Sequence, residues 1–169
     1  MPQMPLRAPR PLASAGALAL LALVATGCSG DESATDNPPV GVVRSDQVNV
    51  LNATLVTDGD DRGTLVASIV NEAPEADTLT DVAITTEDGA LDVVLPDGPV
   101  DLPTDEVVRL APDLRVIAAG DGLEAGFFIE IAYEFDNAPT LRDVVPVRFT
   151  EAEFSEIEVP TEEQFDDAG

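Results

Sequence analysis

Apolar and polar residues alternate with a period of two through most of the chain between Gln47 and Thr150. This period places successive side chains on opposite faces of an extended strand, and no run here has the 3.6-residue period of an amphipathic helix. Turn-forming residues divide the alternation into eight runs, at 48–56, 64–70, 79–85, 91–95, 106–110, 114–118, 127–135 and 143–149. Short strands at this spacing are typical of an antiparallel β-sandwich, so we predict an all-β domain over residues 47–150.

The alternation also assigns side chains to faces of the strands. In the first run it groups Val48, Val50, Asn52, Thr54 and Val56. In the seventh run it groups Phe127, Ile129, Ile131, Tyr133 and Phe135, and because an apolar stripe of this kind usually packs inward, we expect this run to form the centre of the core. Pro146 lies inside the last run, where its missing N–H predicts an edge strand or a bulge.

The first 27 residues differ from the rest of the chain. Arg7 and Arg10 precede an apolar stretch, and small residues ending in Gly27 precede Cys28, the sole cysteine. This layout is that of a secretory signal peptide, and the residues before Cys28 resemble the lipobox of bacterial lipoproteins. We therefore predict cleavage between Gly27 and Cys28, lipidation of Cys28, and a protein exported by the general secretory route and anchored to the outer face of the cell membrane.

Two flanking segments lack the alternation. Residues 28–46 are small, polar and proline-containing, which predicts a flexible tether between the lipid and the domain. Residues 151–169 are rich in acids, with Phe154, Ile157, Val159 and Phe165 among them. We predict a disordered acidic tail, with docking of this segment on a partner as the alternative.

Charge narrows the range of partners. The chain has 33 acidic and 8 basic residues, a formal charge of -25, and removal of the signal peptide would take away two arginines and no acid. Phosphate recognition rests on clustered Lys and Arg, so we expect no nucleic-acid binding. The expected partners are the membrane, through the lipid on Cys28, and a protein of the cell envelope.

The side-chain inventory narrows the chemistry as well. The sequence has no histidine or lysine, and both methionines precede Cys28. This inventory excludes Ser/His/Asp and Cys/His nucleophile systems, Schiff-base chemistry, and zinc or copper(I) sites built on imidazole, thiolate or thioether donors. We therefore expect a protein that is not an enzyme and holds no cofactor.

Carboxylates remain as possible ligands of a hard cation. Asp58, Asp60 and Asp61 lie on a glycine-bearing turn whose sequence resembles the start of a calcium loop. The twelfth position of such a loop is Ile69 here, where glutamate is required, and Asp and Gly are also favoured by turn geometry alone. Three functions therefore remain: a binding module without a metal, a calcium-binding protein that uses these three residues, and a protein with a residual copper role through carboxylates.

Several strings resemble one known family. GTLVASIVNEAPEADTLTDVAITT (63–86), VDLPTDEVVRLAP (100–112) and VVPV (144–147) resemble segments of the periplasmic copper chaperones of PCuAC type. The combination with a lipobox is similar to actinobacterial LpqE-type lipoproteins. The resemblance implies a cupredoxin-like or immunoglobulin-like β-sandwich over about residues 48–149.

The resemblance also implies a copper site of histidine and methionine. Its His-x-Met motif would fall on Arg115-Val116-Ile117, and its earlier ligand pair near Leu95 and Pro96. None of these residues is a copper(I) ligand. The sequence therefore predicts a PCuAC-like lipoprotein that acts as a non-enzymatic binding or accessory module of the cell envelope.

Overall fold

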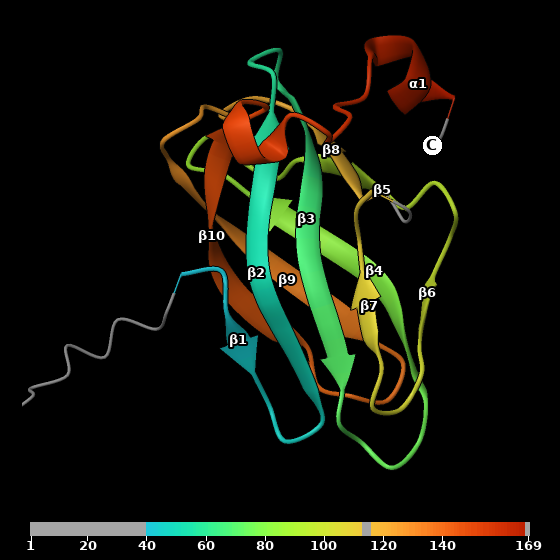
Figure 1. Ribbon diagram of the computed structural model, residues 1–169. Helices are drawn as coiled ribbons and strands as arrows, with labels where there is room; N and C mark the ends of the chain where they lie inside the picture. The colour runs from blue at the N-terminus through green and yellow to red at the C-terminus, as the bar shows by residue number, and fades with distance from the viewer. Residues whose placement is uncertain (1–39, 113–115, 168–169) are drawn as a thin grey trace, which may run out of the picture. The chain divides into compact units, whose positions relative to one another are not determined.

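The computed structural model describes residues 40–112 and 116–167, so the predicted signal peptide and Cys28 lie outside the described residues. Ten strands and two short helices make up the described part (Figure 1). The strands are β1 (Val43–Arg44), β2 (Val48–Thr57), β3 (Arg62–Asn71), β4 (Asp77–Thr85), β5 (Asp92–Val94), β6 (Val100–Leu102), β7 (Val107–Arg109), β8 (Ile117–Ala119), β9 (Phe128–Phe135) and β10 (Leu141–Phe149). The helices are η1 (Ala152–Phe154) and α1 (Glu162–Asp166), and within the described ranges no helix is long and apolar enough to cross a bilayer.

The strands form two layers that share β10. Hydrogen bonds join them in the order β5-β8-β3-β2-β10-β9-β4-β6, with β1 added to β2 and β7 added to β3. The layer of β1, β2, β3, β5, β7 and β8 faces the layer of β4, β6 and β9 (Figure 1), and one cluster of buried apolar side chains fills the space between them. The predicted all-β sandwich is confirmed, and β2 with β10 is the single parallel pair among the strands of the described residues.

β10 changes partner along its length. Leu141 to Pro146 pair with β9, and Val147 to Phe149 pair with β2. Pro146 is the last residue of β10 that pairs with β9, and Val147 is the first that pairs with β2. The missing N–H of the proline therefore lies at the point where the strand changes partner. Residues 141–146 of β10 have β9 as their one strand partner among the described residues, so this part of the strand has a free edge, as the proline predicted.

A β-bulge in β2 changes which of its residues face the core. The pairing with β3 is irregular between Leu51 and Thr54, and Asn52 has a φ of 56°, a left-handed conformation that asparagine tolerates better than most residues. Before the bulge Val48 and Val50 point into the core, and after it Ala53 and Leu55 do. The prediction that Thr54 and Val56 share a face with Val48 is therefore wrong.

β9 forms the centre of the core, as its apolar stripe predicted. Ile129, Ile131 and Tyr133 are buried, and Phe135 packs against the cluster from a partly buried position. Phe127 was assigned to the same face, and that assignment is wrong, since 54% of its surface is exposed. The strand begins one residue later, and Phe127 belongs to the preceding turn, where its N–H donates to the Glu124 carbonyl.

The predicted tether ends earlier than residue 46. Gly41 donates its N–H to the Val144 carbonyl, its own carbonyl accepts from Ala53 N–H, and β1 follows at Val43–Arg44. Gly41 has a φ of 73° and its α-carbon lies against the Ala53 backbone, so a side chain there would collide with the Ala53 carbonyl. Residues from Gly41 onward are therefore part of the folded domain.

The acidic C-terminal segment is ordered over its described residues 151–167, so the prediction of a disordered tail is wrong for them. Thr64 Oγ1 donates to the Glu158 carbonyl at 2.6 Å, and Arg62 Nε donates to the Pro160 carbonyl at 3.1 Å. Thr64 lies on the outward face of β3 yet is only 2% exposed, because this segment covers it. The folded unit therefore extends past the predicted boundary at residue 150.

Candidate functional site

The positions that the PCuAC resemblance assigns to copper ligands lie close together. Val94 of β5 pairs with Ile117 of β8, so Leu95, which follows β5, adjoins Val116, which precedes β8. Val116 is buried in the core cluster and Leu95 packs against that cluster. Arg115 lies outside the described residues.

This pair of segments does not fit a copper ion. Leu95, Pro96, Val116 and Ile117 supply hydrocarbon where copper(I) requires soft donors. Val116 and Ile117 are also buried, at 1% and 2% exposed. We therefore assign no copper chemistry to this part of the fold.

The aspartate-rich turn between β2 and β3 is exposed. Asp58 Oδ1 accepts from the Asp60 N–H at 3.1 Å, and Asp61 adopts a φ of 52°. Across residues 40–112 and 116–167, no group of three or more acidic side chains is placed to hold a metal ion. Asp58, Asp60 and Asp61 are explained by the turn that they form.

Exposed phenylalanines gather at the end of the sandwich where β10 ends and β9 begins. Phe127, Phe128 and Phe149 are 54%, 56% and 50% exposed, and Phe154 of η1 lies nearby. We call these four residues the aromatic end. Exposed apolar side chains are unremarkable when scattered, but a group beside cavities is typical of a contact surface.

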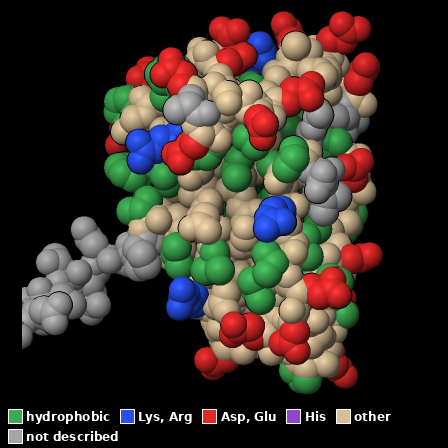
Figure 2. All heavy atoms as spheres, viewed as in Figure 1, with side chains coloured by type: hydrophobic (Ala, Val, Ile, Leu, Met, Phe, Trp, Pro, Cys, Tyr) green, Lys and Arg blue, Asp and Glu red, His purple; other side chains and the backbone are tan. Residues whose placement is uncertain are grey.

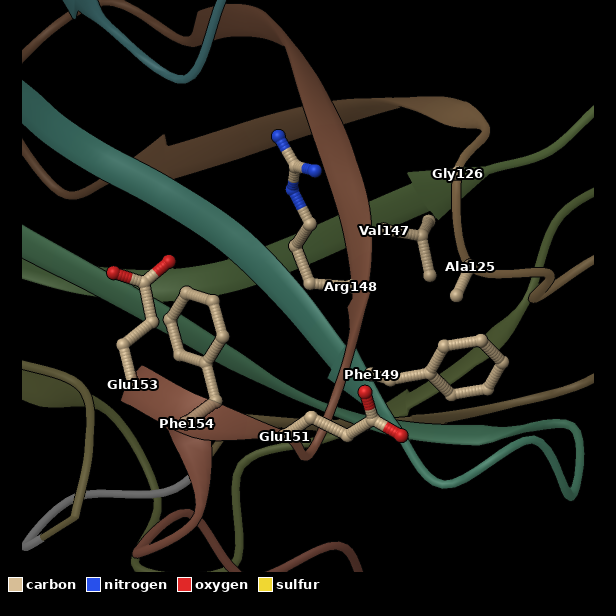
Figure 3. Close-up of a pocket in the computed structure, with 8 residues that line it drawn as sticks. All are labelled: Ala125, Gly126, Val147, Arg148, Phe149, Glu151, Glu153 and Phe154. Carbon is tan, nitrogen blue, oxygen red and sulfur yellow. The ribbon is translucent and has the colours of Figure 1, made fainter.

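The first cavity of the aromatic end has a volume of about 370 Å³. Figure 3 shows Val147 and the Phe149 ring on one side of β10 and Arg148 on the other, with Phe154 rising from η1 beside Glu153. Ala125, Gly126 and Glu151 complete its lining. The cavity therefore combines two aromatic rings with charges of both signs.

The second cavity, of about 220 Å³, has acids as its only charged lining residues. Phe127 and Phe128 line it together with Glu87, Asp88 and Glu124, and no basic side chain is among the described residues that line it. Carboxylates beside aromatic rings favour a cationic group, since both the negative charges and the faces of the rings attract it. This cavity is the best candidate binding site in the described part of the chain.

Hydrogen bonds join two loops at the base of the second cavity. Thr86 N–H and Oγ1 donate to the Gly89 carbonyl and Oγ1 lies 3.1 Å from the Asp121 carbonyl, which joins the loop after β4 to the loop after β8. Gly122 has a φ of 86°, and a Cβ there would lie 2.8 Å from Thr86 Oγ1. A side chain at residue 122 would collide with Thr86, so only glycine allows the two loops to approach this closely.

Two buried carboxylates have opposite electrostatic environments. Burial by itself raises the pKa of Asp77, but N–H donors from Thr78, Ala138 and Asn137 outweigh this effect and hold the pKa below its ordinary value. Burial also raises the pKa of Asp143, and hydrogen bonds from Val144 and Gly41 offset this only in part. Asp77 is therefore stabilised as a carboxylate, whereas Asp143 is destabilised as one.

Asp143 faces the core beside the lone tyrosine. Leu141 pairs with Tyr133, so Asp143, two residues along the same face of β10, is a diagonal neighbour of Tyr133. Neither Tyr133 Oη nor Asp143 Oδ2 has a hydrogen-bond partner. Burial, and then the charge of Asp143, raise the pKa of the Tyr133 hydroxyl, so it stays protonated.

Comparison with known structures places the fold among PCuAC domains. The apo PCuAC domain from PmoF1 superposes with a TM-score of 0.55 at 21% identity, over 64% of this chain and 98% of that one. The copper-bound PCuAC domain from PmoF2 gives 0.53 at 19% identity, over 64% and 97%. Neither a protein-family model nor a curated protein sequence matches this chain. The predicted PCuAC-like fold is confirmed, and at these identities the likeness extends to the fold alone.

Proposed function

We propose that this chain is an exported lipoprotein, anchored through Cys28 to the outer face of the cell membrane, that uses a PCuAC-like fold to bind a protein partner. It is not an enzyme and does not carry copper on histidine and methionine. One observation supports the proposal. The chain has the fold of a domain solved with copper bound, yet its sequence has no histidine and no methionine after position 4, so it lacks the side chains that bind copper(I).

Copper(I) competition tests this proposal. Protein purified from membranes, with Cys28 acylated, should withdraw no copper(I) from a chromogenic chelator, because the segments around Leu95 and Val116 supply no soft donor. The positive control is the PCuAC domain from PmoF2, which has been solved with copper bound. Stoichiometric retention of copper(I) by the unaltered protein would show that the proposal is wrong.

The aromatic end is the surface that we propose for the protein partner. Its second cavity places Phe127 and Phe128 beside Glu87, Asp88 and Glu124, without a basic residue in the described lining. The partner that complements it presents apolar side chains together with Lys or Arg. Aromatic side chains at the centre of an interface commonly carry much of its binding free energy.

Substitution of the two phenylalanines tests the partner surface. Phe127→Ser/Phe128→Ser should reduce retention of a specific envelope protein in affinity purification by about tenfold or more, since interface hot spots contribute about 2 kcal/mol or more. Quantitative mass spectrometry of the captured proteins measures the change. Val144→Ser, at another exposed apolar residue, is the matched control. Equal capture by all three proteins would exclude the aromatic end as the partner surface.

A further inference from the structure

The second cavity takes its acids from two different loops. Glu87 and Asp88 belong to the loop that follows β4, and Glu124 belongs to the loop that follows β8. Asp88 Oδ2 would lie 2.9 Å from a Cβ on Gly122, so this carboxylate rests against the second loop. The close approach of the two loops therefore brings carboxylates from both of them to one cavity.

These carboxylates have no partner in the described part of the chain. Over residues 40–112 and 116–167, no hydrogen bond or ion pair involves the carboxylate of Glu87, Asp88 or Glu124. Asp88 is held through its backbone instead, since its N–H donates to Thr86 Oγ1 at 3.2 Å. All three acidic residues are exposed, and no basic side chain is among the described residues that line the cavity. The negative charge of the cavity is therefore available to a ligand.

Two phenylalanines distinguish this cavity from other acidic parts of the surface. Figure 2 shows acidic side chains at many places on one face of the molecule and basic ones at few, so negative charge alone marks no site. Phe127 and Phe128 are neighbours in sequence, both line the cavity, and each is more than half exposed. The faces of aromatic rings attract cations, as carboxylates do. Two independent features of the cavity thus favour the same kind of ligand.

The size and shape of the cavity narrow this ligand to one side chain. Its volume of about 220 Å³ is smaller than the roughly 300 Å³ at which pockets begin to enclose drug-sized ligands. A guanidinium group is planar and weakly hydrated, so it stacks on an aromatic ring while its N–H groups donate two parallel hydrogen bonds to a carboxylate. An ammonium group is compact, more strongly hydrated and unable to form this pair of bonds. Rings beside carboxylates therefore favour arginine over lysine.

We propose that the second cavity receives the guanidinium group of one arginine side chain of the protein partner, and we call it the arginine pocket. A phenylalanine ring, from Phe127 or Phe128, lies against the plane of the group, and Asp88 and Glu124 accept its N–H donors. The proposal rests on the aromatic end as the partner surface, and it narrows the basic residue of the partner to arginine. Because the pocket is exposed, its contribution to binding decreases as the salt concentration rises.

Peptides that differ in one side chain test the arginine pocket. The full chain, isotopically labelled for amide NMR and purified in a nonionic detergent, is titrated with acetyl-Leu-Arg-Leu-amide and with the same peptide carrying lysine or citrulline in place of arginine. Citrulline keeps the shape of arginine and lacks its charge. We expect the amide signals of Gly122, Gly126 and Phe128 to shift. The arginine peptide should bind about tenfold more tightly than the citrulline peptide and several-fold more tightly than the lysine peptide.

Variants at exposed residues assign the binding to the pocket. Asp88→Asn/Glu124→Gln removes two charges from the pocket and should abolish the preference for arginine over citrulline. Asp101→Asn/Glu106→Gln removes two exposed charges elsewhere and should retain this preference. Equal loss in both double variants would show that the peptide responds to the overall charge of the chain, which would overturn the proposal.

Substitution of the rings separates arginine from lysine. Phe127→Leu/Phe128→Leu keeps apolar side chains at the pocket and removes the rings, so the arginine and lysine peptides should bind this variant with equal affinity. Equal affinity of these two peptides for the unaltered chain, or shifts confined to amides away from the pocket, would overturn the arginine pocket.

The proposed partner surface is judged by a separate measurement. If the peptides show no preference for arginine while Phe127→Ser/Phe128→Ser still reduces capture of the envelope protein, the arginine pocket is wrong and the partner surface stands. Unchanged capture by that variant overturns the partner surface, and with it the assignment of the arginine to the partner.

Discussion

Replacing Asp77 with alanine is expected to lower the free energy of unfolding by about 3 kcal/mol, because it removes several hydrogen bonds to one buried carboxylate. Oδ1 accepts from Thr78 N–H at 2.8 Å, from Asn137 N–H at 2.9 Å and from Asn137 Nδ2 at 3.2 Å, while Oδ2 accepts from Ala138 N–H at 2.8 Å. These bonds fasten the start of β4 to the turn between β9 and β10. Thermal denaturation should show a melting temperature lower by about 10 °C.

The dependence of the free energy of unfolding on pH distinguishes the contribution of the Asp77 charge from that of its acceptor oxygens. Asp77→Asn keeps one acceptor oxygen and should lose about half as much stability at pH 7. The pKa of Asp77 in the folded protein lies below its ordinary value of 3.8, so its stabilising contribution is complete above pH 3.8 and disappears as the pH falls through the folded-state pKa. The melting curves of wild type and Asp77→Asn should therefore converge in acid. Asp101→Asn, at an exposed aspartate of β6, is the control, and equal loss in both variants would contradict the role of Asp77.

Asp143→Asn is expected to have the opposite effect and raise the free energy of unfolding at pH 7 by about 1–2 kcal/mol. Asp143 is 8% exposed, and its Oδ2 has no hydrogen-bond partner. The poorly solvated charge of Asp143 therefore destabilises the folded protein, and the neutral amide of asparagine removes this effect. The expected rise in melting temperature is about 3–8 °C.

The gain from Asp143→Asn should depend on pH. The pKa of Asp143 is raised above 3.8 in the folded protein, so the folded state holds the proton more tightly than the unfolded state. Stability of the wild type therefore falls as the pH rises from 3.8 through the folded-state pKa, and the variant lacks this fall. The two proteins should have similar stability in acid and diverge toward neutral pH. A variant less stable than wild type at pH 7 would show that the Asp143 carboxylate is needed as an acceptor.

The alternation of apolar residues was sufficient to predict the longer strands because each buries one face. β6 (Val100–Leu102) was missed because three residues give too short a pattern to separate from a loop. The bulge at Asn52 was missed because a single left-handed residue leaves the composition of the strand unchanged. Its effect is nevertheless large, because every later side chain of β2 changes face.

The candidate site was less predictable than the fold. Phe127 and Phe149 are more than twenty residues apart, and only the pairing of β9 with β10 brings their ends of the sheet together. The alternation also placed Phe127 in the core, because it cannot locate the first residue of a strand to within one position. The order of the C-terminal segment depends on contacts with Arg62 and Thr64, about ninety residues earlier in the chain, which no local pattern contains.

The change of partner along β10 has a consequence for how the chain acquires its structure. β10 lies between β2 and β9, so the ladder that joins the two layers is completed only when residues 141–149 are present. Pairing β2 with β10 closes a loop of about ninety residues, and contacts this distant in sequence form slowly. The sandwich is therefore completed only when nearly all of the folded segment is available, so a chain that ends before residue 141 would lack the strand that joins its two layers.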